Sequence, residues 1–167
     1  MKYQTEYFFC SPKLLQNVDE LKEIYDSISK TEWEEEFEIT VNGRQYKNQS
    51  GYNKAFEIEL KHYGWGTQPF LHEGLGLKGD FRKNDVLVEV QFGNSATLYR
   101  DYYKFHYGLT HNLLALAVLI VPTKPKIFFP TRPKSVSNMA EFDLALRYFK
   151  VLQIPVPILL IGLLPQN

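Results

Sequence analysis

The pattern of apolar and polar positions along the chain predicts strands separated by helices. Two continuous apolar runs, at 113–121 and 156–164, have the length and composition of strands buried on both faces. A run at 3–10 predicts a first strand, and the stretch 80–91 alternates in the manner of a hairpin.

Apolar residues at helical spacing predict the helices between these strands. The first helix is expected to begin at Pro12, because proline is favoured at the first helical position. Others are expected over 53–63, from Ser95 onward, and over 138–150. This order of elements predicts an α/β fold with a mixed sheet flanked by helices, as a single domain over 1–167.

One hairpin carries most of the candidate chemistry. A two-residue turn at Asn84 and Asp85 would make Asp80 the direct partner of Glu89. Directly opposed residues of an antiparallel pair point to the same face, with Cβ atoms roughly 5 Å apart. Because side chains alternate along a strand, Gln91 would share that face.

This spacing predicts a metal site. Two carboxylates held so close repel each other unless a cation lies between them, and oxygen ligands suit Mg²⁺. Asp80 and Glu89 would hold the metal, and the main-chain carbonyl of Val90 is a candidate third ligand. A metal there would stabilise negative charge on a scissile phosphate.

The attacking water needs further groups. Gln91 is able to orient this water or contact the phosphate, but its amide does not accept a proton near neutral pH. Activation would then fall to the metal or to a second acid. Glu59 is the preferred candidate and Glu57 the alternative, although either can be a surface residue of the preceding helix.

These residues resemble the PD-(D/E)XK nuclease signature, with Asp80, Glu89 nine residues later, and Gln91 in the place of the usual lysine. The string Leu-Val-Glu-Val-Gln-Phe-Gly-Asn-Ser at 87–95 is similar to the variant in restriction endonucleases of the BglII and BstYI type, which have glutamine at that place. In one departure, Gly79 stands where the signature has proline.

The resemblance extends over about 53–121, including the predicted helix before the hairpin. It implies a restriction-endonuclease-like fold with the catalytic core in that range. It also implies Mg²⁺-dependent hydrolysis of double-stranded DNA.

Three segments are candidates for DNA contacts. Asn94, Ser95 and Thr97 lie at the start of a predicted helix, where phosphate oxygens are favoured and base edges can be read. Arg100 and Lys104 lie one turn apart on that helix and are placed to hold the DNA backbone.

The other two candidate segments are loops. One contains Arg132 and Lys134, and the other is the polar, basic segment 44–49. All these basic residues can equally be solvated surface charges.

Charge and composition narrow the class of protein. The chain has 19 basic and 19 acidic residues, and this balance argues against a nonspecific DNA coat protein. A nuclease remains compatible, since acids at a metal site offset basic DNA-facing loops. The single cysteine, Cys10, excludes a disulfide framework or a thiolate zinc site within the chain.

The expected location is the cytoplasm. The N-terminus has no signal-peptide pattern, and the apolar runs are too short to span a bilayer, so no membrane association is expected.

The predicted function is that of a Mg²⁺-dependent DNA endonuclease of restriction type. A homodimer would recognise a palindromic target by symmetry. A catalytic subunit that works with a larger DNA-recognising subunit stays open. Two further alternatives are a structure-specific repair or junction nuclease and a non-catalytic DNA-binding module, and the retained acid pair argues against the module.

Overall fold

A computed structural model describes residues 1–132 and 136–165 of the chain. Its centre is a six-stranded mixed sheet in the order β1-β10-β9-β8-β7-β4. The three middle strands are parallel; β1 and β7 pair antiparallel with the two sides of this group, and β4 pairs antiparallel with β7. The strands are β1 (Lys2–Phe8), β4 (Gly66–Thr67), β7 (Phe81–Lys83), β8 (Val86–Val90), β9 (Leu116–Pro122) and β10 (Ile158–Leu164).

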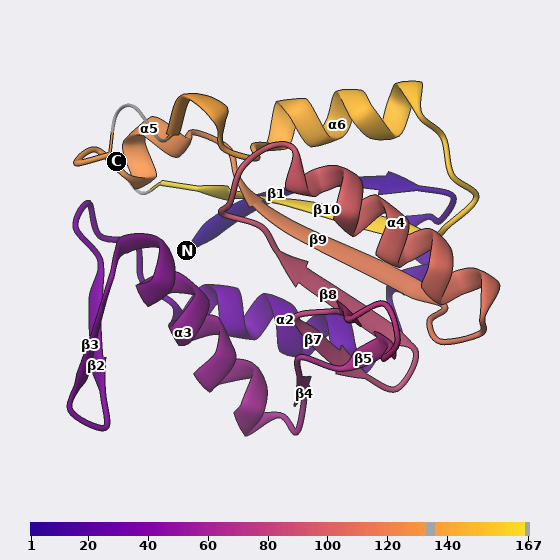
Figure 1. Cartoon of the computed structure of the whole chain (residues 1–167), viewed down its shortest axis with the longest axis horizontal. Helices are drawn as coiled ribbons and strands as arrows, with labels where there is room; N and C mark the ends of the chain where they lie inside the picture. The colour runs from indigo at the N-terminus through magenta and orange to yellow at the C-terminus, as the bar shows by residue number, and fades with distance from the viewer. Residues whose placement is uncertain (133–135, 166–167) are drawn as a thin grey trace.

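Helices cover both faces of this sheet (Figure 1). One face packs against α2 (Asp19–Lys30) and α3 (Asn48–His62), and the other against α4 (Thr97–Thr110) and α6 (Phe142–Val151). The smaller elements are α1 (Pro12–Leu15), α5 (Pro125–Phe128), a 3₁₀ turn (Val136–Asn138), the hairpin β2 (Glu38–Val41)–β3 (Arg44–Lys47) and the hairpin β5 (Phe70–His72)–β6 (Leu77–Lys78).

Alternation along β8 separates the two hydrophobic layers. Val86, Val88 and Val90 belong to the cluster under α2 and α3, whereas Leu87 belongs to the cluster under α4 and α6. Glu89 is buried on the same side as Leu87 because successive side chains point to opposite faces. A carboxylate therefore lies beneath α4, inside an apolar layer.

The predicted fold class and hairpin register are confirmed. Phe81 pairs with Val88 and Lys83 with Val86 around the turn at Asn84 and Asp85. Asn84 adopts a positive φ of 48°, which asparagine tolerates in tight turns.

The predicted helix boundaries need correction. The helix expected from Pro12 is divided into α1 and α2, because Val18 is extended. Helix α3 begins at Asn48, and its first turn packs closely on β3 and on Phe37 before β2: a Cβ at Gly51 would lie 3.1 Å from the Tyr46 carbonyl oxygen and 3.0 Å from the Phe37 ring. Helix α4 begins two residues after Ser95, with Ala96 at its N-cap.

The last predicted helix also starts later than expected, at Phe142. No helix in the described ranges has the length and apolar character needed to cross a membrane.

Candidate active site

The site forms where the β7–β8 hairpin opens. Ladder pairing ends at Phe81 and Val88, so the N–H of Val90 has no strand partner on that side. One carboxylate oxygen of Asp80 accepts this N–H at 2.8 Å, while the Asp80 carbonyl accepts the N–H of Gln68 at 2.8 Å. These bonds direct the Asp80 side chain toward β8.

Glu89 is the most buried carboxylate of the site, with 1% of its surface exposed. Its Oε2 accepts a hydrogen bond from Lys104 Nζ at 2.6 Å, whereas its buried Oε1 has no hydrogen-bond partner among the described residues. Burial raises the pKa of Glu89 well above its usual value; the Asp80 charge adds to the rise and Lys104 opposes it.

Asp80 carries a similar electrostatic cost. Burial raises the pKa of its carboxyl group above the usual value, although the Val90 N–H and the Lys104 charge act in the opposite direction. Two neighbouring carboxylates are thus ionised only at a cost, and an additional cation would lower that cost.

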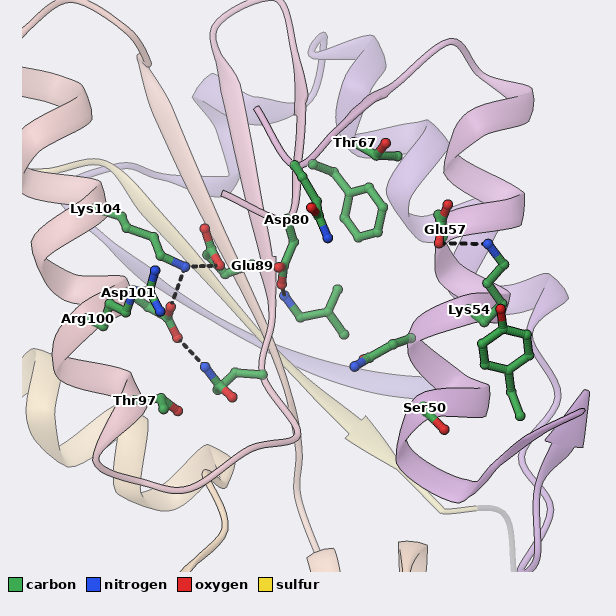
Figure 2. A pocket seen from close by; sticks show the side chains of 16 residues that line it. Ser50, Lys54, Glu57, Thr67, Asp80, Glu89, Thr97, Arg100, Asp101 and Lys104 are labelled. Carbon is green, nitrogen blue, oxygen red and sulfur yellow. Dashed lines mark hydrogen bonds and ion pairs between the residues drawn. The ribbon is translucent and has the colours of Figure 1, made fainter. Parts of the chain in front are cut away.

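Helix α4 supplies a second layer of charged groups. Lys104 Nζ lies 3.0 Å from Asp101 Oδ1, and Asp101 Oδ2 accepts a hydrogen bond from Gln91 Nε2 at 2.8 Å. The Gln91 Oε1 accepts the N–H of Gly93 at 2.8 Å. A continuous chain of contacts therefore joins Glu89, Lys104, Asp101 and Gln91, as the dashed lines in Figure 2 show.

The predicted contact of Lys104 with the DNA backbone stays a prediction. Its side chain borders the cavity, but it is only 6% exposed and pairs with two carboxylates. Asp101, 1% exposed, was missed. Its three-residue spacing from Leu98 and four-residue spacing to Phe105 place it on the apolar face of α4, and that signal could have identified it.

A cavity of about 580 Å³ opens in front of these groups, between α3 and α4. Asp80, Glu89, Val90 and Gln91 all border it, so the structure brings these predicted site residues together. Among the described residues there is no cluster of three or more His, Cys, Asp and Glu side chains arranged to hold a metal.

The preference for Glu59 needs correction. Glu57 borders the cavity and Glu59 does not, because residues two apart on a helix point in different directions. The Glu57 carboxylate pairs with Lys54 at 3.0 Å and with Lys61 at 2.5 Å. Burial acts to raise the pKa of Glu57, but the two lysines outweigh it and hold this pKa below its usual value.

The predicted DNA contacts lie at several places. Thr97 and Arg100 border the cavity, whereas Ser95 borders a second cavity of about 630 Å³. The side-chain oxygen of Asn94 accepts the Ala96 N–H at 2.9 Å and so orders the start of α4.

The described residues of the two loops predicted to contact DNA, one with Arg132 and Lys134 and the other at 44–49, contribute little to the lining of the first cavity. Arg132 hydrogen-bonds Gln49 at 3.4 Å, outside the lining of the first cavity. Lys134 lies outside the described residues. From the segment 44–49, Tyr46 reaches the cavity lining.

The fold and the site together define a class. A paired, buried acid at the open end of a hairpin, beside a cavity bordered by basic side chains, is the arrangement expected of a phosphodiester-cleaving nuclease. A family model described as "Restriction endonuclease BglII/BglIII" matches residues 3–163. The chain belongs to this family, and its activity class is that of a type II restriction endonuclease.

Solved structures agree with this assignment at the level of the fold. The chain is similar to restriction endonuclease BglII complexed with a DNA 16-mer, with a TM-score of 0.79 and 22% identity, over 99% of this chain and 78% of that one. It is also similar to free BglII, with a TM-score of 0.70 and 22% identity, over 99% of this chain and 81% of that one. The search of curated proteins found no match.

These comparisons confirm the predicted resemblance, fold class and endonuclease class. The roles of the individual site residues stay predictions.

Proposed function

We propose that the enzyme cuts double-stranded DNA at a specific sequence, with Mg²⁺ bound at Asp80 and Glu89. The observation that carries this proposal is the buried Oε1 of Glu89, which has no hydrogen-bond partner among the described residues and lies near the partly buried carboxylate of Asp80. An unpaired carboxylate oxygen in an apolar layer is costly, and a hard cation is the natural partner for it.

The donor set fits this cation. Asp80, Glu89 and the main-chain carbonyl of Val90 would hold Mg²⁺, and all three residues border the cavity. When bound, the metal supplies positive charge for the scissile phosphate and makes a coordinated water more acidic.

The chain's own polar groups would position the substrate and the water. Asp101 and the Gly93 N–H hold the Gln91 amide in one orientation, and the second N–H of that amide is available to the attacking water or to a phosphate oxygen. On the far wall, Glu57 is better suited to accept a hydrogen bond from water than to take its proton, because its pKa is lowered.

Basic groups on two sides of the cavity would hold the DNA backbone. Lys54 projects from α3 and Arg100 from α4, on opposite sides of the carboxylate pair (Figure 2). Phosphate contacts of this kind fix the position of the duplex without reading its sequence. The similarity to BglII in complex with a DNA 16-mer supports duplex DNA as the substrate.

Cleavage of both strands requires two active sites. We propose a homodimer, which would read a palindromic target by its symmetry. A catalytic subunit paired with a larger DNA-recognising subunit is the alternative, and it would nick DNA when acting alone.

The test is digestion of supercoiled plasmid DNA with Mg²⁺, comparing the wild type with Glu89→Ala and with Glu73→Ala, whose glutamate is exposed and outside the cavity lining. Discrete fragments from the wild type and from Glu73→Ala, with loss of cleavage in Glu89→Ala or in a chelator, would support the proposal. Full cleavage by Glu89→Ala would exclude it. A smear would argue against sequence specificity, and open circles would favour the single-subunit alternative.

A further inference from the structure

The buried ammonium group of Lys104 has no assigned part in this proposed function. Its Nζ lies 2.6 Å from Glu89 Oε2 and 3.0 Å from Asp101 Oδ1, and both carboxylates are 1% exposed. It is therefore the positive charge in direct contact with the buried acids of the described site. Lys104 pairs with Glu89 and Asp101, and the charge of Arg100 also acts on the nearby Asp80, so the three acids outnumber the two cations.

We propose that Lys104 is a positioning residue that acts as an internal counter-cation, competing with the divalent metal for Glu89 and thereby setting the metal affinity of the site. This inference rests on the proposed metal site at Asp80 and Glu89. Lys104 would hold the Glu89 carboxylate in place while the metal is absent, and would weaken metal binding by its charge.

The geometry supports competition because the two oxygens of Glu89 differ. Lys104 occupies Oε2, while Oε1 has no hydrogen-bond partner among the described residues. A divalent cation at Oε1 would come close to the ammonium, and two like charges separated by a few ångströms in a buried site repel strongly.

Asp101 allows the competition to be reversible. It contacts Lys104 Nζ independently of Glu89, so the ammonium keeps a charged partner when Glu89 turns toward a metal. Asp101 also holds the Gln91 amide, which links the position of Lys104 to the residue expected to orient water. Figure 2 shows Lys104 and Asp101 projecting from α4 toward Glu89.

The alternative is a purely structural ion pair. Loss of a buried lysine would then destabilise the protein by the same amount whether or not a cation is present. The semi-buried pair of Lys83 and Glu23, with 2.6 Å between Lys83 Nζ and Glu23 Oε1, provides a matched control outside the cavity lining.

The experiment compares thermal unfolding of the full chain in chelator and in millimolar CaCl₂, without DNA, for the wild type, Lys104→Met, Lys104→Gln, Lys104→Arg and Lys83→Met. Calcium is used because it is a hard cation with oxygen ligands. Any ligand that binds only the folded state raises Tm according to its affinity.

The neutral Lys104 variants should melt below the wild type in chelator and gain more from calcium than the wild type does. Calorimetric titration should give a calcium affinity at least roughly tenfold tighter for these variants, since one unit charge is removed a few ångströms away. Lys104→Arg should behave like the wild type. Lys83→Met should lose stability with no larger response to calcium.

A calcium-dependent rise no larger in Lys104→Met and Lys104→Gln than in the wild type would overturn the inference. Failure of both neutral variants to fold even in calcium would overturn it too, because the metal is expected to replace the lost ammonium. Mg²⁺-dependent plasmid cleavage by the wild type is measured separately, so the proposed function can stand while this inference fails.

Discussion

At the scale of single residues, the charges of the acid pair, Asp80 and Glu89, lower the stability of the fold but are needed for the proposed activity. Glu89 is buried and Asp80 is partly buried, and burial together with their mutual repulsion raises the pKa of Glu89. Such unfavourable charges persist in proteins where activity requires them. Removing one of them should therefore separate stability from catalysis.

Asp80→Asn is expected to abolish cleavage while raising the free energy of unfolding of the metal-free protein by roughly 0.5–2 kcal/mol at neutral pH. The pKa of Asp80 is higher in the folded than in the unfolded chain, so its ionised form costs stability above the raised pKa. Below the unfolded pKa both forms are protonated and the gain should vanish. Urea unfolding from strongly acidic to neutral buffer measures this.

Asp143→Asn is the control, since Asp143 is exposed on α6. A gain in Asp80→Asn that does not change with pH, or a loss of stability at neutral pH, would contradict the electrostatic account.

The glycine before Asp80 should be intolerant of a side chain. A Cβ at Gly79 would lie 2.6 Å from Leu87 Cδ1 and 3.2 Å from Glu89 Oε1. Gly79→Ala should therefore cost about 1–3 kcal/mol of stability through overpacking and also reduce cleavage by displacing Glu89. Gly66→Ala, whose Cβ would meet its nearest neighbour at 3.4 Å, is the matched control for both measurements. Equal stability and activity of the two variants would refute the close packing of Gly79 against Leu87 and Glu89.

At the scale of elements, α4 has two roles on one face. Leu98 and Phe105 pack into the layer beneath the helix, while Lys104 reaches Glu89 and is itself held by Asp101. The sheet thus fixes the rotation of the helix, and that rotation places the charged side chains at the site. Arg100 points to the cavity from the neighbouring position on the same helix.

Arg100→Ala should weaken DNA binding in calcium and reduce the slope of log affinity against log salt by about 1, as expected for one lost phosphate contact. Lys150→Ala is the control, because Lys150 is an exposed residue at the end of α6. Filter binding or fluorescence anisotropy at several salt concentrations gives both slopes. An unchanged slope in Arg100→Ala would remove Arg100 from the proposed DNA contacts.

At the scale of the whole molecule, the cavity lies between helices from opposite faces of the sheet. Helix α3 belongs to one layer and α4 to the other (Figure 1). Residues of both helices border the cavity in front of the carboxylates, where the β7–β8 hairpin opens. Within residues 1–132 and 136–165, one cavity carries the proposed acid pair. Whether the enzyme cuts both strands therefore depends on whether two chains assemble into a dimer or one chain pairs with a recognition subunit.

Co-expression of wild-type and Glu89→Ala chains is expected to produce hybrid dimers that nick a plasmid and accumulate open circles, whereas the wild type alone yields linear product. The reason is that each subunit of a homodimer would cut one strand. Sedimentation of the protein with and without DNA gives the assembly directly. A wild-type enzyme that sediments as a monomer and only nicks would support a separate recognition subunit.

Local rules determined a large part of this protein from its sequence. The turn at Asn84 and Asp85 sets the hairpin register, and strand alternation places Glu89 and Gln91 together, because both depend on neighbours within a dozen residues. The apolar runs likewise identified the central strands β9 and β10, whose starts lie two or three residues later than predicted and whose ends agree within one residue. The resemblance to a restriction endonuclease rested on the same short stretch, and the family match bears it out.

Only the tertiary structure decided which helix residues face the acids. Lys104 looked like a surface cation and Glu59 like the nearer acid, yet Lys104 is buried and Glu57 borders the cavity. Asp101 was missed, although its spacing from Leu98 and Phe105 puts it on the apolar face of α4. The direction of a helical side chain depends on how the whole helix packs against strands far away in sequence, and the residues of the helix alone do not specify which groups its buried face contacts.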